Sequence, residues 1–122
     1  MNLGDVQLRT SGSTVIAKLT GEIDLSNAPS IGQAIARGVS HDAVALVVDM
    51  TELEYLDSAG IQLVYQLRES LRARAQDCLL VLTPDSPPAD ALRLAGITSH
   101  LRITQTLDEA LATVTRSAEE PS

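Results

Sequence analysis

The sequence predicts a single α/β domain built on a mixed sheet whose central strands are parallel. Two continuous apolar runs, 43–48 and 78–82, are typical of strands that are covered on both faces. Predicted strands and helices alternate along most of the chain, which favours parallel strands joined by crossover helices. With 122 residues and 44% hydrophobic side chains, the chain is long enough to bury one core.

The first two strands are short, and in the second Val15, Ala17 and Leu19 share one face while Ile16 and Lys18 take the other. The two strands span residues 6–10 and 14–19, and the polar stretch 11–13 between them predicts a turn. Residues 20–24 are polar or small apart from one isoleucine, which indicates a second turn.

A helix and a buried strand follow the second turn. Ser26 or Asn27 is suited to cap the helix. Pro29 fits in its first turn, and Gly38 is suited to end it. The apolar run 43–48 then forms the third strand.

The second half of the chain continues the alternation of strands and helices. Apolar residues at helical spacing predict a helix over 59–73, and the run 78–82 is the fourth strand. The next helix begins at Asp85 or Ser86 and ends near Gly96.

The last predicted elements are a short strand at 100–104 and a helix. The sequence Thr-Leu-Asp-Glu at 106–109 is a capping box, so the helix is expected to run to about Arg116. Residues 117–122 are expected to form a disordered polar tail, which leaves one domain over 1–116.

Charge and residue content exclude several classes of function. Sixteen acidic against nine basic side chains give a net charge of −7, which argues against a nucleic-acid partner. The single cysteine, Cys78, cannot form an internal disulfide or a zinc site. No apolar run approaches the roughly 20 residues that span a bilayer. We therefore expect a cytoplasmic domain without membrane partners.

No arrangement of residues points to catalysis. His41 and His100 are the only imidazoles, and no Gly-x-Ser-x-Gly turn is present to aim a nucleophilic serine. The glycine-rich loops that bind mononucleotides or dinucleotides are also absent from the sequence. These observations predict a protein that is not an enzyme and uses no cofactor or metal.

A phosphoacceptor-aspartate receiver domain shares this length and alternation, and Asp49 would be its acceptor. Receivers hold magnesium with an acidic pair after their first strand and carry a lysine near their last. In this chain a polar turn without acidic residues follows the first strand, and Lys18 is the only lysine. The receiver interpretation is therefore rejected.

One candidate site remains, Leu56-Asp57-Ser58-Ala59-Gly60, just before the strongest predicted helix. Asp57 or Ser58 can serve as the helix N-cap, and this structural role would explain the segment by itself. A serine at a helix start is also exposed, beside N–H groups and a positive dipole end that favour an anion. Such a position suits covalent phosphorylation.

Three segments taken together resemble the STAS domain family. Gly21-Glu22-Ile23-Asp24 follows the second strand, Val47-Val48-Asp49 ends the third, and Leu56-Asp57-Ser58-Ala59-Gly60 opens a helix. The similarity covers residues 5–115 and is closest to the bacterial anti-sigma factor antagonists. The resemblance implies a mixed, mostly parallel sheet with helices packed mainly on one face.

The resemblance also implies a partner-switching function. In this family the unphosphorylated antagonist binds an anti-sigma factor that is also a serine kinase, and this frees a sigma factor. The kinase phosphorylates the antagonist to release itself, and a phosphatase resets the cycle. By resemblance the acceptor is Ser58. The implied partner-binding residues are Glu22, Ile23, Asp24, Ser26, Asp57, Ser58, Ala59 and Gly60.

Other members of the family have different roles, including stressosome scaffolds and modules associated with transporters. The alternative function is therefore a scaffold or transporter-associated domain without a phosphorylation cycle. A kinase-fold anti-sigma factor encoded beside this protein would distinguish the two.

Overall fold

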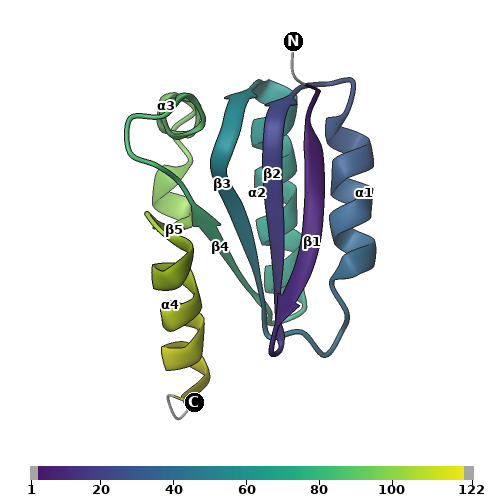
Figure 1. Ribbon diagram of the computed structural model, residues 1–122, viewed down its shortest axis with the longest axis vertical. Coiled ribbons are helices and arrows are strands. Elements are labelled where there is room, and N and C mark those ends of the chain that lie inside the picture. The colour runs from purple at the N-terminus through teal and green to yellow at the C-terminus, as the bar shows by residue number, and fades with distance from the viewer. Residues whose placement is uncertain (1–2, 120–122) are drawn as a thin grey trace.

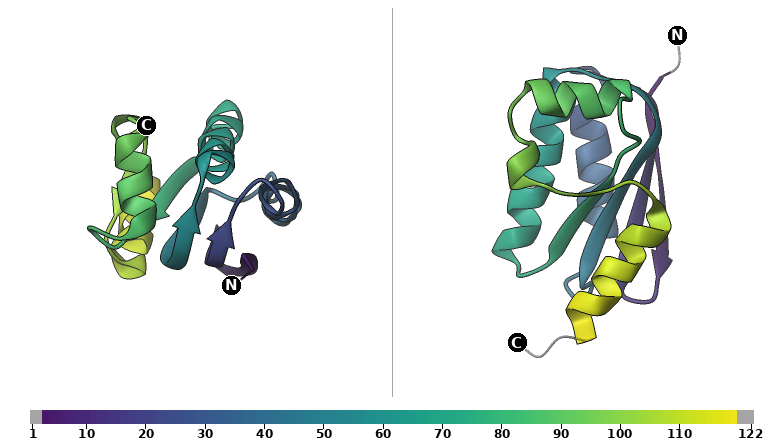
Figure 2. Two further views of the ribbon diagram at one scale, coloured as in Figure 1. Left: turned by 90° about the horizontal axis from the view of Figure 1, so that it is seen from above. Right: turned by 90° about the vertical axis from the view of Figure 1, so that its left-hand side faces the viewer.

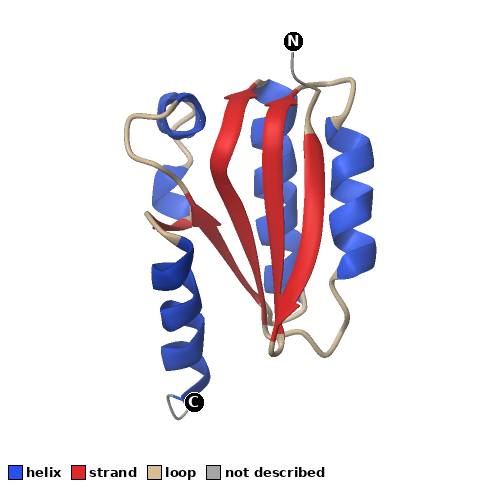
Figure 3. Ribbon diagram, viewed as in Figure 1, coloured by secondary structure: helices blue, strands red, loops and turns tan. Residues whose placement is uncertain are grey.

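Five strands form one sheet in the order β1-β2-β3-β4-β5, with helices packed around it (Figures 1 and 3). The computed structural model describes residues 3–119. The strands are β1 (Asp5–Ser11), β2 (Thr14–Ile23), β3 (Ala45–Leu56), β4 (Asp77–Val81) and β5 (Arg102–Thr104). The helices are α1 (Ala28–Gly38), α2 (Ser58–Ala73), α3 (Pro87–Leu94) and α4 (Leu107–Glu119), with a short 3-10 helix η1 (Thr98–His100).

The sheet is mixed, as the sequence predicts. β1 and β2 form an antiparallel hairpin in which Ser11 pairs with Thr14, whereas β2, β3, β4 and β5 run parallel. Gly12 in the hairpin turn has a φ of +60°, a left-handed conformation that glycine adopts without steric cost. Most of each apolar run, residues 45–48 and 78–81, lies in β3 and β4, which are neighbours in the sheet, while exposed Val44 lies just before β3. Their prediction as central buried strands is confirmed.

One face of the sheet carries the larger core. Val15, Ala17 and Leu19 of β2 belong to this face, and the buried residues of α1 and α2 pack in the same cluster. Figure 2 (left) looks along the strands and shows both helices on one side of the sheet. Leu92 of α3 is fully buried in this cluster as well. Three helices therefore serve one core.

The opposite face is covered by α4. Ala110 and Val114 of this helix share a cluster with Ile16, Val47 and Leu79 from three adjacent strands. Figure 2 (right) shows α4 crossing the lower part of the sheet. The expectation that helices pack mainly on one face is thus confirmed, with α4 as the exception.

Two expectations about strand length are wrong. The sequence pattern predicts a turn over 20–24, but β2 continues to Ile23. The pattern also ends the third strand with the run 43–48, but β3 continues to Leu56. Both strands therefore reach further, and the loops that follow them begin at the far edge of the sheet.

Irregular pairing between β2 and β3 explains why the pattern is misleading. Met50, Leu53 and Leu56 are all buried, although their spacing of three does not match the two-residue period of a regular strand. Two register shifts between the strands accommodate this spacing. Gly21 lies at one shift with a φ of +75°, a conformation that favours glycine.

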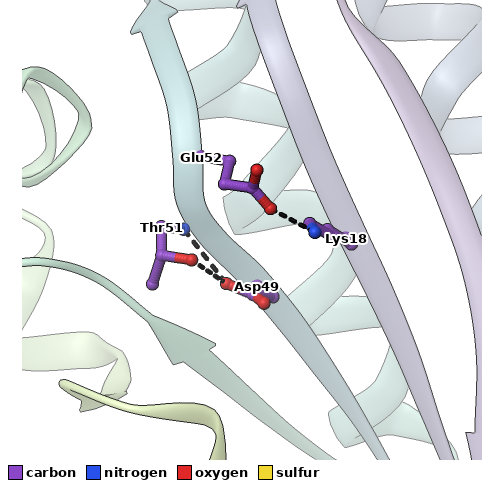
Figure 4. Close-up of polar contacts among 4 residues, drawn as sticks. All are labelled: Lys18, Asp49, Thr51 and Glu52. Atoms are coloured by element: carbon purple, nitrogen blue, oxygen red, sulfur yellow. Dashed lines mark hydrogen bonds and ion pairs between the residues drawn. The ribbon is translucent and has the colours of Figure 1, made fainter.

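Asp49 lies within β3 instead of at the end of a strand. It is buried, and its carboxylate accepts hydrogen bonds from the amide and hydroxyl of Thr51 at 3.0 and 2.8 Å (Figure 4). Lys18 is paired with Asp49 in the register but forms its ion pair with Glu52. A buried, hydrogen-bonded aspartate in mid-strand is unsuited to accept a phosphoryl group, which agrees with the rejection of a receiver domain.

The last helix begins where the sequence predicts. The Thr106 hydroxyl accepts from the Glu109 amide at 3.1 Å, and the Glu109 carboxylate accepts from the amide just before Thr106 at 3.2 Å. The capping box is therefore present, with its return bond shifted by one residue. α4 continues to Glu119, beyond the predicted end at Arg116. The rest of the expected tail, 120–122, lies outside the described residues.

Candidate functional site

The two motifs singled out in the sequence lie side by side at one edge of the sheet. β2 and β3 are parallel neighbours, and their last residues, Ile23 and Leu56, are paired. The loop containing Asp24 follows β2 and helix α2 follows β3, so both begin at this edge (Figure 1). The Asp57 amide donates to the Ile23 carbonyl at 3.2 Å. This bond ties the start of α2 to the end of β2.

Asp57 is the N-cap of α2. Its carboxylate accepts from the amides of Ala59 and Gly60, at 2.9 and 3.2 Å, which satisfies two of the donors that a helix start leaves unpaired. Ser58 is the first residue of the helix and is exposed. Its hydroxyl forms no hydrogen bond within residues 3–119 and is therefore free to react.

The loop between β2 and α1 is held by a network around Asp24. The Asp24 carboxylate accepts from the amide and the hydroxyl of Ser26, at 2.9 and 2.5 Å. These bonds, from the Ser26 hydroxyl first, lower the pKa of Asp24 from its ordinary value of 3.8, so the side chain is charged at neutral pH. The Asn27 side chain accepts from the Asp24 amide and donates to the Glu22 carbonyl. The loop therefore presents a negative charge in a defined geometry.

Gly60 allows α2 to start close to the sheet. A Cβ added to it would lie 2.2 Å from Leu56 Cδ1 and 3.2 Å from Ile23 Cγ2, far inside ordinary contact distances. Glycine therefore fits this position because the helix packs directly over the paired ends of β2 and β3. Ile23 itself is fully buried.

The partner-binding residues proposed from the sequence differ in how exposed they are. Ser26 and Ser58 are exposed, and four others are partly buried: Glu22, Asp24, Asp57 and Ala59. Ile23 and Gly60 are buried and shape the site from beneath. All eight belong to the two connections at this edge of the sheet or to the residues that flank them.

Sequence reasoning missed the apolar surface beside this site. Leu25 is 75% exposed between Asp24 and Ser26. It lines a groove of about 500 Å³ between α1 and α2, which also includes Ala59. None of the residues that line the groove is charged. An apolar residue between two polar turn residues was the available signal, since turns are usually polar.

Other kinds of site are less well supported. Among residues 3–119, no group of three or more His, Cys, Asp or Glu side chains is arranged to hold a metal ion. Burial raises the pKa of the Cys78 thiol to about 12, so this cysteine stays protonated. No helix in the described part of the chain is long and apolar enough to cross a membrane.

The arrangement of sheet, helices and motifs defines a known class of domain. A family model for the STAS domain matches residues 5–110. The chain belongs to the STAS domain family.

Several named relatives are anti-sigma factor antagonists. The chain is 27% identical over 109 residues to the anti-sigma-F factor antagonist RsfB of Mycobacterium tuberculosis, covering 89% of this chain and 88% of RsfB. The structure of an anti-sigma factor antagonist from Mycobacterium paratuberculosis matches with a TM-score of 0.82 and 26% identity, over 93% of this chain and 95% of the other. The Bacillus cell fate determinant SpoIIAA, solved in its phosphorylated form, matches with a TM-score of 0.66 and 25% identity, over 90% and 99%.

Proposed function

We propose that this protein is an anti-sigma factor antagonist that is switched off by phosphorylation of Ser58. In the unphosphorylated state it binds an anti-sigma factor through the surface made by the Asp24 loop and the start of α2. The observation that carries this proposal is the exposed, unbonded Ser58 hydroxyl beside the charged Asp24 loop. The protein acts as a regulatory binding partner in the cytoplasm and not as an enzyme.

The relatives support both the proposed antagonist role and the proposed phosphorylation. RsfB, which aligns over most of both chains, is named as an antagonist of an anti-sigma factor. SpoIIAA has been solved in a phosphorylated form and shares this fold. We propose that the partner of the present chain is an anti-sigma factor and that this partner is also the serine kinase.

The proposed reaction adds a phosphoryl group to the Ser58 side chain. The Ser58 oxygen attacks the γ-phosphorus of ATP held by the kinase, ADP leaves, and the hydroxyl proton is released. A phosphatase reverses the change by transferring the phosphoryl group to water. Both steps need an accessible serine, which the first position of α2 provides.

The added charge explains how phosphorylation would release the partner. Phosphoserine carries about −1.5 to −2 charges at neutral pH, next to the Asp57 carboxylate. That carboxylate already accepts from the Ala59 and Gly60 amides, so these donors are not open to the phosphate. A partner packed over Ser58 would have to desolvate the new charge. A cost of about 3 kcal/mol would lower affinity on the order of a hundredfold.

Incubation of the protein with candidate anti-sigma kinases and ATP tests the proposal. Mass spectrometry is expected to map one phosphate to Ser58. Ser58→Ala should abolish the modification, while Ser99→Ala, which changes an exposed serine elsewhere on the surface, should leave it intact. Phosphate mapped to another residue would refute the assignment. A protein that binds no anti-sigma factor would favour the scaffold alternative.

A further inference from the structure

Three of the eight arginines of this acidic chain line one pocket. Arg68, Arg72 and Arg102 surround a cavity of about 280 Å³ together with His100. The pocket lies where the last turns of α2 meet the start of β4 and the η1–β5 segment. Because α2 begins at Ser58, the pocket is at the opposite end of the helix from the proposed phosphorylation site.

The ion pairs around the pocket leave one guanidinium unpaired. Arg68 contacts Glu69 at 2.9 Å, and Arg102 contacts Asp77 at a longer 3.5 Å. Arg72 is exposed and has no ion pair or side-chain hydrogen bond within residues 3–119. Within residues 3–119, the pocket therefore carries one arginine charge that no carboxylate pairs with.

A structural role accounts for only part of this arrangement. A cation in the last turn of a helix is favourable because it offsets the negative end of the helix dipole, and Arg72 occupies such a position in α2. Arg68 lies one turn earlier. Arg102 comes from β5, a separate segment of the chain. Helix capping does not explain why arginines from two separate segments line the same pocket.

The chemistry of the lining indicates the ligand. The lining residues include three arginines and one acidic residue, Asp77, and no Tyr, Phe or Trp on which a nucleobase could stack. Gln76 adds no free donor, since its amide nitrogen is used on the carbonyls of Ser40 and Ala43. Guanidinium forks suit oxyanions with several oxygens. The volume is below the usual range for drug-sized ligands, about 300–1,000 Å³.

We propose that this pocket binds a small phosphoryl anion, either inorganic phosphate or a simple phosphomonoester. A tetrahedral phosphoryl group offers at least three oxygens, so it can accept from guanidiniums on different sides of the pocket, whereas a carboxylate offers one planar edge. The site is independent of Ser58 and of the proposed antagonist function.

Titration of the full 122-residue protein with sodium phosphate tests the proposal. Ionic strength is kept constant with chloride at neutral pH, and binding is followed by amide proton–nitrogen correlation NMR. Saturable shifts are expected at Arg72, Cys78 and Arg102 and not at Ser58, with a Kd of about 1 mM or tighter. Glycerol 3-phosphate serves as the second probe. Tighter binding of this probe identifies a phosphomonoester ligand, and otherwise inorganic phosphate is the ligand.

A matched pair of variants separates a site from general charge attraction. Arg72→Gln should raise the Kd at least about tenfold, or about 1.4 kcal/mol. Arg37→Gln removes the same charge from the last turn of α1 and should leave the Kd unchanged. Shifts that do not saturate with either probe, or that chloride alone reproduces, overturn the proposal. Equal weakening by the two variants also overturns it.

Discussion

The backbone amide of Asp57 donates to the carbonyl of Ile23 at 3.2 Å. The two residues belong to different motifs that are distant in the sequence. Ile23 is the last residue of β2, and Asp57 directly follows β3, the parallel neighbour of β2. The bond therefore fixes the start of α2 against the loop that contains Asp24. Substitutions in either segment are expected to affect the same binding event.

The identity of the helix cap can be measured by stability. Asp57→Ala should lower the free energy of unfolding by about 1 kcal/mol, because the amides of Ala59 and Gly60 lose their acceptor. Ser58→Ala should change it by less than about 0.5 kcal/mol, since this hydroxyl caps nothing. Urea denaturation of both variants gives the comparison. Similar losses in the two would contradict the assignment of Asp57 as the cap.

A charge at position 58 should act on binding more than on folding. Ser58→Glu is expected to fold like the wild type and to bind the anti-sigma factor about a hundredfold more weakly. The reason is that its carboxylate would be buried against the partner beside Asp57. Ser99→Glu carries the same charge elsewhere and should bind normally. Titration calorimetry measures both affinities, and wild-type affinity for Ser58→Glu would remove Ser58 from the interface.

The Asp24 loop should contribute to partner binding. Asp24→Ala removes the acceptor for Ser26 and is expected to weaken binding about tenfold, or about 1.4 kcal/mol. The melting temperature should fall only slightly, because the loop lies outside the core. Asp42→Ala, at an exposed position between α1 and β3, is the control. Unchanged affinity in Asp24→Ala would place this loop outside the interface.

The lowered pKa of Asp24 makes a prediction about acid stability. A carboxyl group with a lower pKa in the folded state stabilises the fold above its unfolded pKa, and the contribution is lost as pH falls through the folded value. The stability difference between wild type and Asp24→Asn should therefore be constant from neutral pH down to the region of 3.8, and shrink below it. Urea denaturation at several acidic pH values checks this. A difference that is the same at neutral and at strongly acidic pH would disprove the linkage.

Two valine-to-aspartate substitutions test whether the face of the sheet beneath α4 is a packed core. Val47 is fully buried beneath α4, whereas Val44 is 44% exposed just before the same strand. Val47→Asp should cost more than about 3 kcal/mol or prevent folding, because a carboxylate would be buried without a partner. Val44→Asp should stay close to the wild type. Thermal melts that place the two variants together would show that this face is not a packed core.

The core strands are predictable from sequence because their signals are local. The runs in β3 and β4 are apolar throughout, and only burial on both faces accommodates that pattern. The far part of β3 is not predictable in this way. Met50, Leu53 and Leu56 are buried at a spacing that a regular strand does not produce, and the register shifts that create it depend on pairing with β2.

The candidate site is likewise only partly predictable from the sequence. Asp57 and Ser58 stand out locally, since a capping residue before a strong helix is visible in the sequence. Asp24 has no such signature. Its place beside the helix start depends on the parallel pairing of two strands, so only the resemblance to a family pointed to it. Leu25 is an apolar residue between two polar turn residues, but the sequence does not show that its side chain is exposed, because exposure is a tertiary property.

The Asp57 side chain already occupies two of the amide donors in the first turn of α2. Few amide donors in that turn would therefore be free to bind a phosphate on Ser58, so the backbone would have little reason to rearrange around it. The two states of the antagonist would then share one backbone conformation and differ in the phosphoryl group on Ser58 and the charge that it carries. The partner would then recognise a change in the surface of the protein and not a change in its fold. The speed of the switch would be set by the enzymes that add and remove the phosphate, not by a conformational step in this protein.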